Sequence, residues 1–543
     1  MSRVIHKNNG NIYSLFNNDY FNIIALLTVS SLLFMFNLGG YPLFDPDETI
    51  HAQIAKTIVD TGNWITPTFN GQNFYDKPIL YFWMNAASFS LFGVSEFAAR
   101  LPAAVFGILG VILTYFIGKN LFDRTTALLS GLILTTSFEY IILSRIVVHD
   151  ITLAIAITAS LLFFYLGYNT QNKKWIYHLP LYVFLGIGSL AKGPIGILLP
   201  AGIIFLFLSL SRELRELKKM GLWWGIPLTL LVASPWYVLI AIKNPDYLYY
   251  FFINQNRDRF LSPYARHAAP FYFYIPILVG GILPWTFFLI QAIGHMIPRR
   301  FTDLNEKKEM MFLMCWLAVI FLFFSVASSK LITYILPVFP SVALMLGKYW
   351  KDYIYSEVRY VKGVSYALYV FSGTLVCFSI GLIFYVGYSR PEYIAISIPV
   401  ATFMLVLSVI SVFYTYKDKR LSQFVMVGIS MVFFICYSNY YIMPAVGHYR
   451  STRELSDKIN AVLKDKEPLC FYDGQENSII YYTGRSPIRI PNKRALQELL
   501  NLKERQYIIM KIKDYKELKD IMGKRAKIIM QEGKYLLLEI QKV

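Results

Sequence analysis

Residues Phe44–Trp83, with the sequence FDPDETIHAQIAKTIVDTGNWITPTFNGQNFYDKPILYFW, decide how the rest of the chain is organised. They directly follow the first apolar segment of a chain that is 56% hydrophobic and only 16% charged. Their ionisable side chains include Asp45, Asp47, Glu48, His51, Asp76 and Lys77. Carboxylates at the mouth of a membrane span are costly unless they are solvated or serve a function. We therefore predict that Asp47 lies at the centre of an active site at the outer face of a membrane.

The composition of the 543 residues is that of a multi-span membrane protein, because a soluble chain rarely keeps so few charges. The net charge is +18, and basic loops between spans normally report orientation rather than a ligand, so nucleic acid is not an expected partner. The four cysteines show no spacing typical of a disulfide framework or a metal site. We interpret Asn22–Gly40 as a retained span rather than a signal peptide.

The apolar segments predict a polytopic α-helical protein with about thirteen membrane spans. The predicted spans are 22–40, 98–118, 127–146, 150–168, 176–191, 194–210, 222–242, 271–293, 310–327, 331–347, 364–387, 393–415 and 422–441. The segment Ile79–Gly93 is apolar but too short to cross a membrane, so we predict an interfacial helix there.

The distribution of Lys and Arg predicts the orientation. With the N-terminus in the cytoplasm, the inner loops and the N-terminus hold 21 of these residues and the longer outer segments hold 11. The odd number of spans then places the C-terminal tail outside the membrane. We predict a membrane domain over residues 1–443, with an outer loop at 41–97, and a separate periplasmic domain over 444–543.

The C-terminal tail differs in kind from the rest of the chain. Short β-rich runs at Leu469–Tyr472, Gln506–Ile512 and Ile528–Ile540, the last with a turn at Gly533, alternate with helical stretches at Arg494–Leu502 and Tyr515–Met522. This alternation predicts a small α/β domain.

Unusual polar residues gather at the predicted outer ends of the spans. They fall on five segments: the loop after the first span, the turn around His149 and Asp150, the AKGPIG turn with Lys192, the loop Asn254–His267, and the segment SSKLITYILP with Lys330 and Tyr334. Five such segments on one face indicate a shared site. Its cations suit an anionic group, and an Arg can hold a phosphate with two hydrogen bonds. Taken one at a time, however, each cation could equally bind ordinary lipid headgroups.

The sequence from Phe44 to Trp83 resembles the first outer loop of the bacterial lipid A aminoarabinose transferases, within the protein O-mannosyltransferase-like superfamily of GT-C glycosyltransferases. DE, GNWITPxxNG, DKP and KGPIG occur in the order and spacing of that family, and SPW at Ser234–Trp236, RF at Arg259–Phe260 and SSKLITYILPVFP extend the likeness. The resemblance implies a GT-C fold of about thirteen helices, a site facing the periplasm of the bacterial inner membrane, and a small periplasmic α/β domain.

The resemblance also implies roles for particular residues. The proposed catalytic acid of the family falls on Asp47, with Glu48 beside it, and a second outer-loop acid matches Asp150. The lysine thought to contact the donor phosphate matches Lys77. The further donor-binding candidates are Tyr81, Lys192, Arg257, Arg259, His267, Lys330 and Tyr334. The family associates a Glu with a divalent cation at the position of Asp76, so Asp76 is a candidate metal ligand, and His267 is a second candidate.

Two further motifs depart from the family pattern. The aminoarabinose branch reads DExRY where this chain has Asp47-Glu48-Thr49-Ile50-His51, and Phe74 replaces the first aromatic of a YFEKP run.

The expected function is an inverting glycosyltransferase that uses a polyprenyl phosphate sugar as donor and lipid A as the leading acceptor, without a nucleotide cofactor. A polyprenyl phosphate is a good leaving group, so the protein need mainly stabilise the charge left on it, which suits Lys77 and Arg259. Asp47 would take a proton from a hydroxyl acceptor, or position an acceptor that is already ionised. The alternatives are a protein O-glycosyltransferase, a transporter, or a non-catalytic lipid-binding protein.

Overall fold

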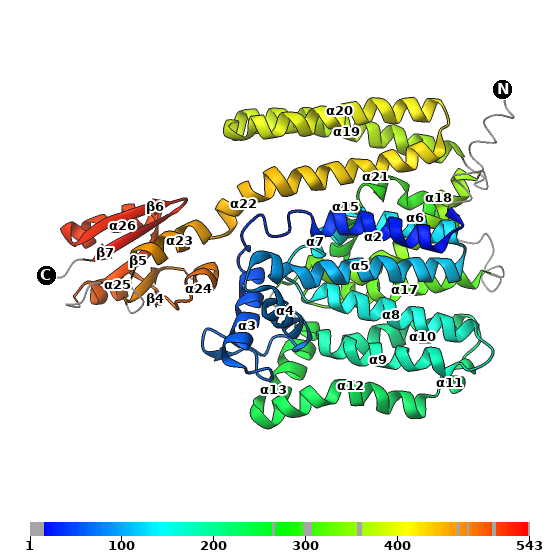
Figure 1. Cartoon of the computed structure of the whole chain (residues 1–543), viewed down its shortest axis with the longest axis horizontal. Coiled ribbons are helices and arrows are strands. Elements are labelled where there is room, and N and C mark those ends of the chain that lie inside the picture. The colour runs from blue at the N-terminus through cyan, green and yellow to red at the C-terminus, as the bar shows by residue number, and fades with distance from the viewer. Residues whose placement is uncertain are drawn as a thin grey trace. The chain divides into compact units, whose positions relative to one another are not determined.

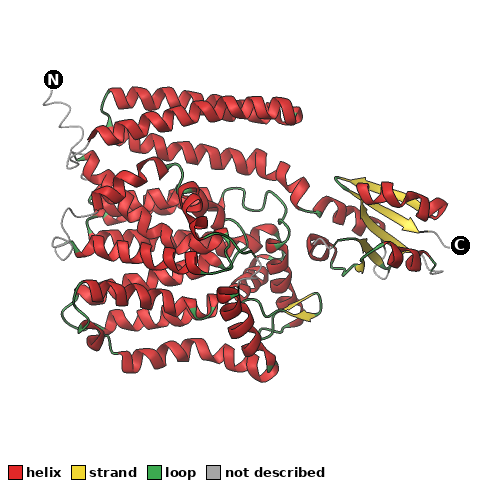
Figure 2. Ribbon diagram, turned by 180° about the vertical axis from the view of Figure 1, so that it is seen from behind, coloured by secondary structure: helices red, strands yellow, loops and turns green. Residues whose placement is uncertain are grey.

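The computed structural model describes residues 16–262, 267–296, 307–355, 361–463, 467–474, 477–501 and 506–540. The described chain divides into two units. The membrane unit contains residues 16–36, 75–81 and 100–438, and the tail unit contains residues 37–74, 82–99 and 439–540. Helices make up most of both units, and strands occur only in the tail unit among these residues (Figure 2).

Apolar helices, some of them long and some short, make up the membrane unit (Figure 1). They are α2 (Asp19–Met35), α5 (Glu96–Leu121), α6 (Arg124–Thr135), α7 (Phe138–Leu143), α8 (Asp150–Asn169), α9 (Trp175–Lys192), α10 (Ile195–Leu210), α12 (Leu222–Lys243), α15 (Tyr274–Gly281), α16 (Leu289–Met296), α17 (Lys308–Val326), α18 (Phe339–Ile354), α19 (Val361–Ser389), α20 (Ile394–Tyr416) and α21 (Arg420–Tyr437). Within the described residues, eight helices are long and apolar enough to cross a membrane, or nine with one bent pair. The chain is therefore a multi-pass membrane protein, and the count of thirteen spans stays a prediction.

Two segments predicted as single spans are broken instead. The predicted span 127–146 consists of α6 and α7, which are separated at Thr136 and Ser137. The predicted span 271–293 bends by 109° between Phe271–Gly281 and Trp285–Met296. A proline at position 284 supplies no backbone N–H to a helix, which explains the second break. The two breaks meet, because Phe138 N donates to Leu283 O at 3.0 Å and Trp285 Nε1 donates to Thr136 Oγ1 at 3.0 Å. Each helix break thus supplies a hydrogen-bond partner for a polar group that the other break leaves without one in its own helix.

Residues Asn254–Leu261 are helical, whereas the sequence predicted a loop over Asn254–His267, of which residues 263–266 lie outside the described residues. After α13 (Asp246–Tyr249), the chain forms a π-helix, η1 (Tyr250–Asp258), and then α14 (Arg259–Leu261). The end of this segment pairs with the chain between α17 and the 3₁₀ helix η5 (Ile332–Val338): Ser329 N donates to Arg259 O at 3.2 Å, and Ser328 N donates to Phe260 O at 3.0 Å.

The tail unit contains the predicted α/β domain. Its strands are β3 (Leu469–Tyr472), β4 (Ile488–Ile490), β5 (Gln506–Lys511), β6 (Ala526–Glu532) and β7 (Tyr535–Ile540). They form one sheet with the order β4–β3–β5–β7–β6, in which β3 pairs in parallel with β4 and β5, and β7 pairs antiparallel with β5 and β6. The helices are α22 (Met443–Arg450), α23 (Arg453–Val462), α24 (Asn477–Thr483), α25 (Lys493–Leu500) and α26 (Ile512–Met522). Separate apolar clusters cover the two faces of the sheet, as a three-layer arrangement requires.

The outer loop of the sequence analysis falls largely in the tail unit. It forms α3 (Asp47–Thr61), a hairpin of β1 (Thr68–Phe69) and β2 (Gln72–Asn73), and α4 (Leu80–Phe92), where an interfacial helix was predicted. Gly62 ends α3 with a φ of 68°, and Asn70 and Gly71 turn the hairpin with φ values of 53° and 75°. Such left-handed angles favour Gly and Asn, which the sequence supplies at these turns.

Candidate functional site

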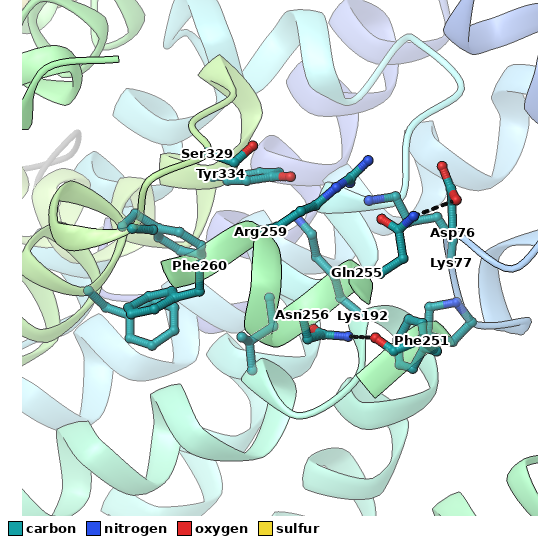
Figure 3. Close-up of a pocket in the computed structure, with 15 residues that line it drawn as sticks. Asp76, Lys77, Lys192, Phe251, Gln255, Asn256, Arg259, Phe260, Ser329 and Tyr334 are labelled. Carbon is teal, nitrogen blue, oxygen red and sulfur yellow. Dashed lines mark hydrogen bonds between the residues drawn. The ribbon is translucent and has the colours of Figure 1, made fainter. Parts of the chain in front are cut away.

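A pocket in the membrane unit brings together side chains from segments that lie far apart in the sequence (Figure 3). Its lining consists of Asp76, Lys77, Pro78, Lys192, Ile195, Phe251, Gln255, Asn256, Arg259, Phe260, Phe323, Phe324, Ala327, Ser329 and Tyr334. Five of these residues were predicted as site residues, namely Asp76, Lys77, Lys192, Arg259 and Tyr334. They come from the segment before α4, from the end of α9, from α14 and from η5.

Three cations form one side of the pocket. Lys192 is the last residue of α9, and Gly193 ends that helix with a φ of 76°. The Nζ of Lys192 forms a buried ion pair with Asp150 at the start of α8, and it lies 3.8 Å from the centre of the Tyr334 ring. A side chain at position 193 would meet the ring of Phe251 at 2.8 Å, so this glycine lets the aromatic wall approach the lysine.

Lys77 belongs to the same cationic group. It is half-buried, and burial lowers the pKa of Lys77 from its usual value. The positive charges of Lys192 and Arg259 lower the pKa further, whereas Tyr334 and Asp150 act in the opposite direction. Cations held this close repel one another, and an anion between them would relieve that repulsion. The arrangement therefore favours a phosphate or a similar anion.

Aromatic and aliphatic side chains form the other side of the pocket. Phe251 comes from η1, Phe260 from α14, and Phe323 and Phe324 from the end of α17. The rings of Phe260 and Phe323 have centroids 5.1 Å apart. Cations facing an apolar wall suit a ligand that joins a phosphate to a hydrocarbon chain.

Asp76 is held by neutral donors. Its Oδ1 accepts hydrogen bonds from the Tyr250 hydroxyl at 3.0 Å and from Gln255 Nε2 at 2.8 Å. Gln255 Nε2 also donates to the Tyr250 hydroxyl at 2.7 Å. The π-helix brings these two side chains, five residues apart, together at the carboxylate. No group of three His, Cys, Asp or Glu side chains suited to a metal ion occurs among the described residues. These side chains do not by themselves fit a metal centre, so metal binding by Asp76 and His267 stays a prediction.

Several other predicted donor-binding residues lie elsewhere. Lys330 does not line the pocket: its Nζ donates to Ala269 O at 3.0 Å and to Ala327 O, which fixes the loop beside Ser329. Arg257 is exposed and pairs with its neighbour Asp258 at 3.0 Å. His267 is exposed and uses its carbonyl to accept from Lys330 N at 3.0 Å. Tyr81 is buried, with its ring centroid 4.8 Å from that of His149. The sequence cannot distinguish a lysine that binds backbone carbonyls from one that binds a ligand.

The predicted acids Asp47 and Glu48 lie in the tail unit, at the start of α3. Asp47 is exposed and is the first residue of the helix. Glu48 is buried, and its Oε2 accepts from Phe44 N at 2.9 Å. Glu48 therefore fixes the turn that leads into the helix, and Asp47 is the acid of the pair that remains accessible.

Three pocket residues of the π-helix, Phe251, Gln255 and Asn256, were not predicted from the sequence, and neither was Tyr250, which donates to Asp76. The polar run NQNRDRF was noted, but its periodicity as a π-helix has no signal in a single sequence, because π-helices are rare and short. The sequence does contain one indication of these residues. Aromatic residues directly precede amides and arginines in this segment, a pattern that can form a wall with an apolar part and a polar part.

The Lys192–Asp150 pair leads to a prediction about stability. Removing one partner of a buried ion pair leaves an uncompensated charge and typically costs about 3–5 kcal/mol. We expect Lys192→Ala to lower the Tm in detergent clearly, and Lys192→Met with Asp150→Leu to recover much of the loss. Lys219→Ala is the matched control, because Lys219 pairs with Glu216 at the surface and is 59% exposed. A wild-type Tm for Lys192→Ala would contradict a buried pair.

Comparisons with known proteins agree with this architecture. The family model for dolichyl-phosphate-mannose-protein mannosyltransferase matches residues 76–239. The undecaprenyl phosphate-alpha-4-amino-4-deoxy-L-arabinose arabinosyl transferase 2 of Proteus mirabilis is 31% identical over 336 residues, which cover 61% of this chain and 59% of that protein. The corresponding transferase of Shewanella sediminis is 33% identical over 320 residues, which cover 58% and 57%. The matched region thus spans less than two thirds of the length of these relatives.

The crystal structure of ArnT from Cupriavidus metallidurans bound to undecaprenyl phosphate superimposes with a TM-score of 0.80 and covers 95% of this chain and 97% of that one, at 19% sequence identity. The similarity thus extends over both units at the level of the fold. Residues 76–239 are thus similar to the dolichyl-phosphate-mannose-protein mannosyltransferase family, more than half of the chain is similar to undecaprenyl phosphate aminoarabinose transferases, and the chain has the fold of ArnT.

Proposed function

We propose that this protein is a glycosyltransferase that moves a sugar from a polyprenyl phosphate carrier to lipid A or a related glycolipid. The observation that carries the proposal is the pocket in which Lys77, Lys192 and Arg259 face an aromatic wall. Two further observations support it: relatives from Proteus mirabilis and Shewanella sediminis are named for an undecaprenyl phosphate sugar, and the ArnT structure of the same fold holds undecaprenyl phosphate.

In this proposal the pocket binds the donor. The phosphate lies among the three cations, and the first part of the polyprenyl chain lies against Phe251, Phe260 and Phe323. As the bond between the sugar and the phosphate breaks, negative charge grows on the phosphate oxygens. Cations that are already in place stabilise that charge without reorganisation, so the carrier phosphate becomes a better leaving group. The pair with Asp150 and the Tyr334 ring keep Lys192 oriented for this task.

Asp47 is the proposed catalytic acid, on the basis of the sequence resemblance and its accessibility at the start of α3. It would accept the proton of a hydroxyl acceptor as the acceptor attacks the anomeric carbon. With a phosphate as acceptor, which is already ionised, Asp47 would instead position it. In-line attack opposite the leaving phosphate inverts the anomeric centre. No step in this mechanism uses a metal or a nucleotide.

The proposed location is the bacterial inner membrane, with the pocket and the tail unit on the periplasmic side. The excess of Lys and Arg in the predicted inner loops supports this orientation. A carrier-linked sugar in the outer leaflet would then reach the pocket from the membrane.

The test is a reconstituted transfer reaction. The full-length protein in liposomes receives undecaprenyl phosphate aminoarabinose and lipid A, and mass spectrometry follows the gain of the sugar on lipid A. We expect transfer that requires both substrates. A protein acceptor that gains the sugar while lipid A does not would favour the O-glycosyltransferase alternative. Absence of transfer from any polyprenyl phosphate sugar to either acceptor would contradict the proposal.

A further inference from the structure

We propose that a polar hollow within the tail unit binds the acceptor, and that its ligand is a carbohydrate headgroup that carries an anionic substituent. This inference rests on the proposed function and adds to it a site for the second substrate. The residues of the hollow belong to the loop 40–46, to the region of α22 and α23, to the start of α24, and to the turn between β6 and β7.

The hollow consists of two adjoining cavities. One has a volume of about 280 Å³ and the other a volume of about 310 Å³, and they share Ser451, Thr452, Lys534 and Tyr535. Together they fall in the size range of small-molecule binding sites. Every residue that lines either cavity belongs to the tail unit.

Hydrogen bonds fix the wall of the hollow that contains Asp45 and Pro46. Asp45 N donates to Arg450 O at 2.9 Å. The Asp45 carboxylate accepts from Ser478 N at 2.8 Å, from the Ser478 hydroxyl and from Thr49 Oγ1 at 2.6 Å. Ser478 Oγ in turn accepts from Thr452 N at 3.1 Å. This wall is therefore a preformed surface rather than a loose crevice.

A second set of bonds holds the chain just before this wall. Leu43 N donates to the Tyr482 hydroxyl at 2.8 Å, and that hydroxyl donates to Glu96 Oε1 at 3.0 Å. Arg453 Nη1 forms an ion pair with the same Glu96 oxygen at 2.6 Å. Tyr482 and Ser478 both belong to α24, so one short helix of the tail holds residues 43 to 49 at two points.

The lining of the cavity beside Asp45 suits a hydroxyl-rich ligand with a negative charge. Tyr449 supplies an exposed aromatic ring, and Thr452 and Asn477 supply a hydroxyl and an amide. The exposed cations Arg450 and Lys534 outnumber the one carboxylate of this cavity, Asp45. The adjoining cavity is lined by the carboxylates Glu454, Asp457 and Glu532, so the anionic group is assigned to the cavity beside Asp45. Sugar rings pack on aromatic faces and exchange hydrogen bonds with such polar groups, whereas a phosphate or carboxylate would pair with the two cations.

The position of the wall in the sequence connects the hollow with the chemistry. Asp45 and Pro46 directly precede Asp47, the proposed catalytic acid. A headgroup held against this wall lies beside the backbone that carries the acid. The donor pocket is lined only by residues of the membrane unit, so each of the two substrates has a site of its own.

The first test separates the two substrates kinetically. We expect Lys534→Ala to raise the KM for lipid A about tenfold, the loss typical of one charge-assisted hydrogen bond, and to leave the KM for the polyprenyl phosphate donor unchanged. Lys534→Arg should retain the wild-type KM. Lys527→Ala is the matched control, because Lys527 is an exposed lysine of the same β6–β7 hairpin and lines neither cavity.

An unchanged KM for lipid A in Lys534→Ala would overturn the inference, and so would an equal rise in the KM for the donor. Inorganic phosphate added as a competitor distinguishes a headgroup from the free ion: weak competition at millimolar phosphate supports recognition of the whole headgroup, and competition as strong as that of lipid A overturns it. A wild-type protein that transfers no sugar at all would instead contradict the proposed function, so the two failures are distinguishable.

A second pair of variants tests the fixed wall. Ser478→Ala removes the hydroxyl that binds Asp45, and Ser456→Ala removes an equally buried hydroxyl from α23. No hydrogen bond of Ser456 Oγ is found among the described residues. We expect the KM for lipid A to rise in Ser478→Ala and not in Ser456→Ala, with Ser478→Thr close to wild type. Equal behaviour of both alanine variants would overturn a preformed acceptor wall.

Discussion

Asp47→Asn is expected to lower the rate of sugar transfer by about 10³-fold, while the amount of folded protein in the membrane stays the same. The amide keeps the shape of the side chain but can neither accept a proton nor stabilise positive charge on the sugar. Because Asp47 is exposed and its neighbour Glu48 makes the buried hydrogen bond, the substitution removes charge without removing a structural contact of the turn. Single-turnover transfer to lipid A in liposomes measures the loss.

The matched control for this variant is Asp60→Asn. Asp60 is an exposed acid near the opposite end of the same helix, α3, so it reports any general effect of lost charge. A rate for Asp47→Asn within a fewfold of that for Asp60→Asn would rule out Asp47 as the catalytic acid. It would then favour a non-catalytic role for the fold or a different acid, with Asp150 the next candidate.

Lys77→Ala is expected to lower kcat/KM for the donor by about 10²- to 10³-fold, because it removes one of three cations from the leaving phosphate. The KM for lipid A should stay unchanged, since Lys77 lines the donor pocket only. Lys243→Ala, an exposed lysine at the end of α12, is the control. Equal donor kinetics in the two variants would mean that the pocket does not bind the carrier phosphate.

The lowered pKa of Lys77 adds a pH dependence to this prediction. Burial disfavours the ammonium form, so in the free protein Lys77 loses its charge at a lower pH than an ordinary lysine does. The KM for the donor should therefore rise as the pH increases above the lowered pKa, because the neutral amine attracts the phosphate less. In Lys77→Arg, which stays protonated, this alkaline rise should disappear. The same rise in wild type and Lys77→Arg would assign it to another group.

The lowered pKa of this lysine also makes the stability of the folded protein depend on pH. A lysine with a lower pKa in the folded state than in the unfolded state binds fewer protons when folded, so its contribution to the free energy of unfolding increases with pH between the two values. The donor affinity and this part of the stability thus change in opposite directions with pH.

The sequence was most informative where function depends on short local patterns. DKP and AKGPIG place a lysine beside a proline or a glycine, and these turns bring Lys77 and Lys192 to the same pocket. Strands β3 and β5 and the β6–β7 hairpin were also predicted, the hairpin from a β-rich run with a Gly533 turn, whereas β4 was not predicted. In both cases the deciding interactions lie within a few residues of one another.

Long-range pairing explains what the sequence analysis could not predict. Ser478 lies 433 residues after Asp45, and no pattern in either segment predicts their hydrogen bonds. Lys330 was predicted to bind the donor, and its ammonium donates to the carbonyls of Ala269 and Ala327, a tertiary arrangement that the sequence does not reveal. The two broken helices read as continuous apolar spans, because the bond from Phe138 N to Leu283 O that satisfies both breaks is also a tertiary interaction.

Arg259 and Phe260 form backbone hydrogen bonds with Ser329 and Ser328, and the ammonium of Lys330 binds nearby carbonyl groups. These bonds hold together the two ends of the segment from residue 260 to residue 328. Arg259 therefore stays in place whatever the length or course of the bent helices between these two ends. Evolution can therefore reshape those bent helices without displacing Arg259 from the pocket. Proteins built on this plan would diverge first in the bent helices and last in the residues that line the pocket.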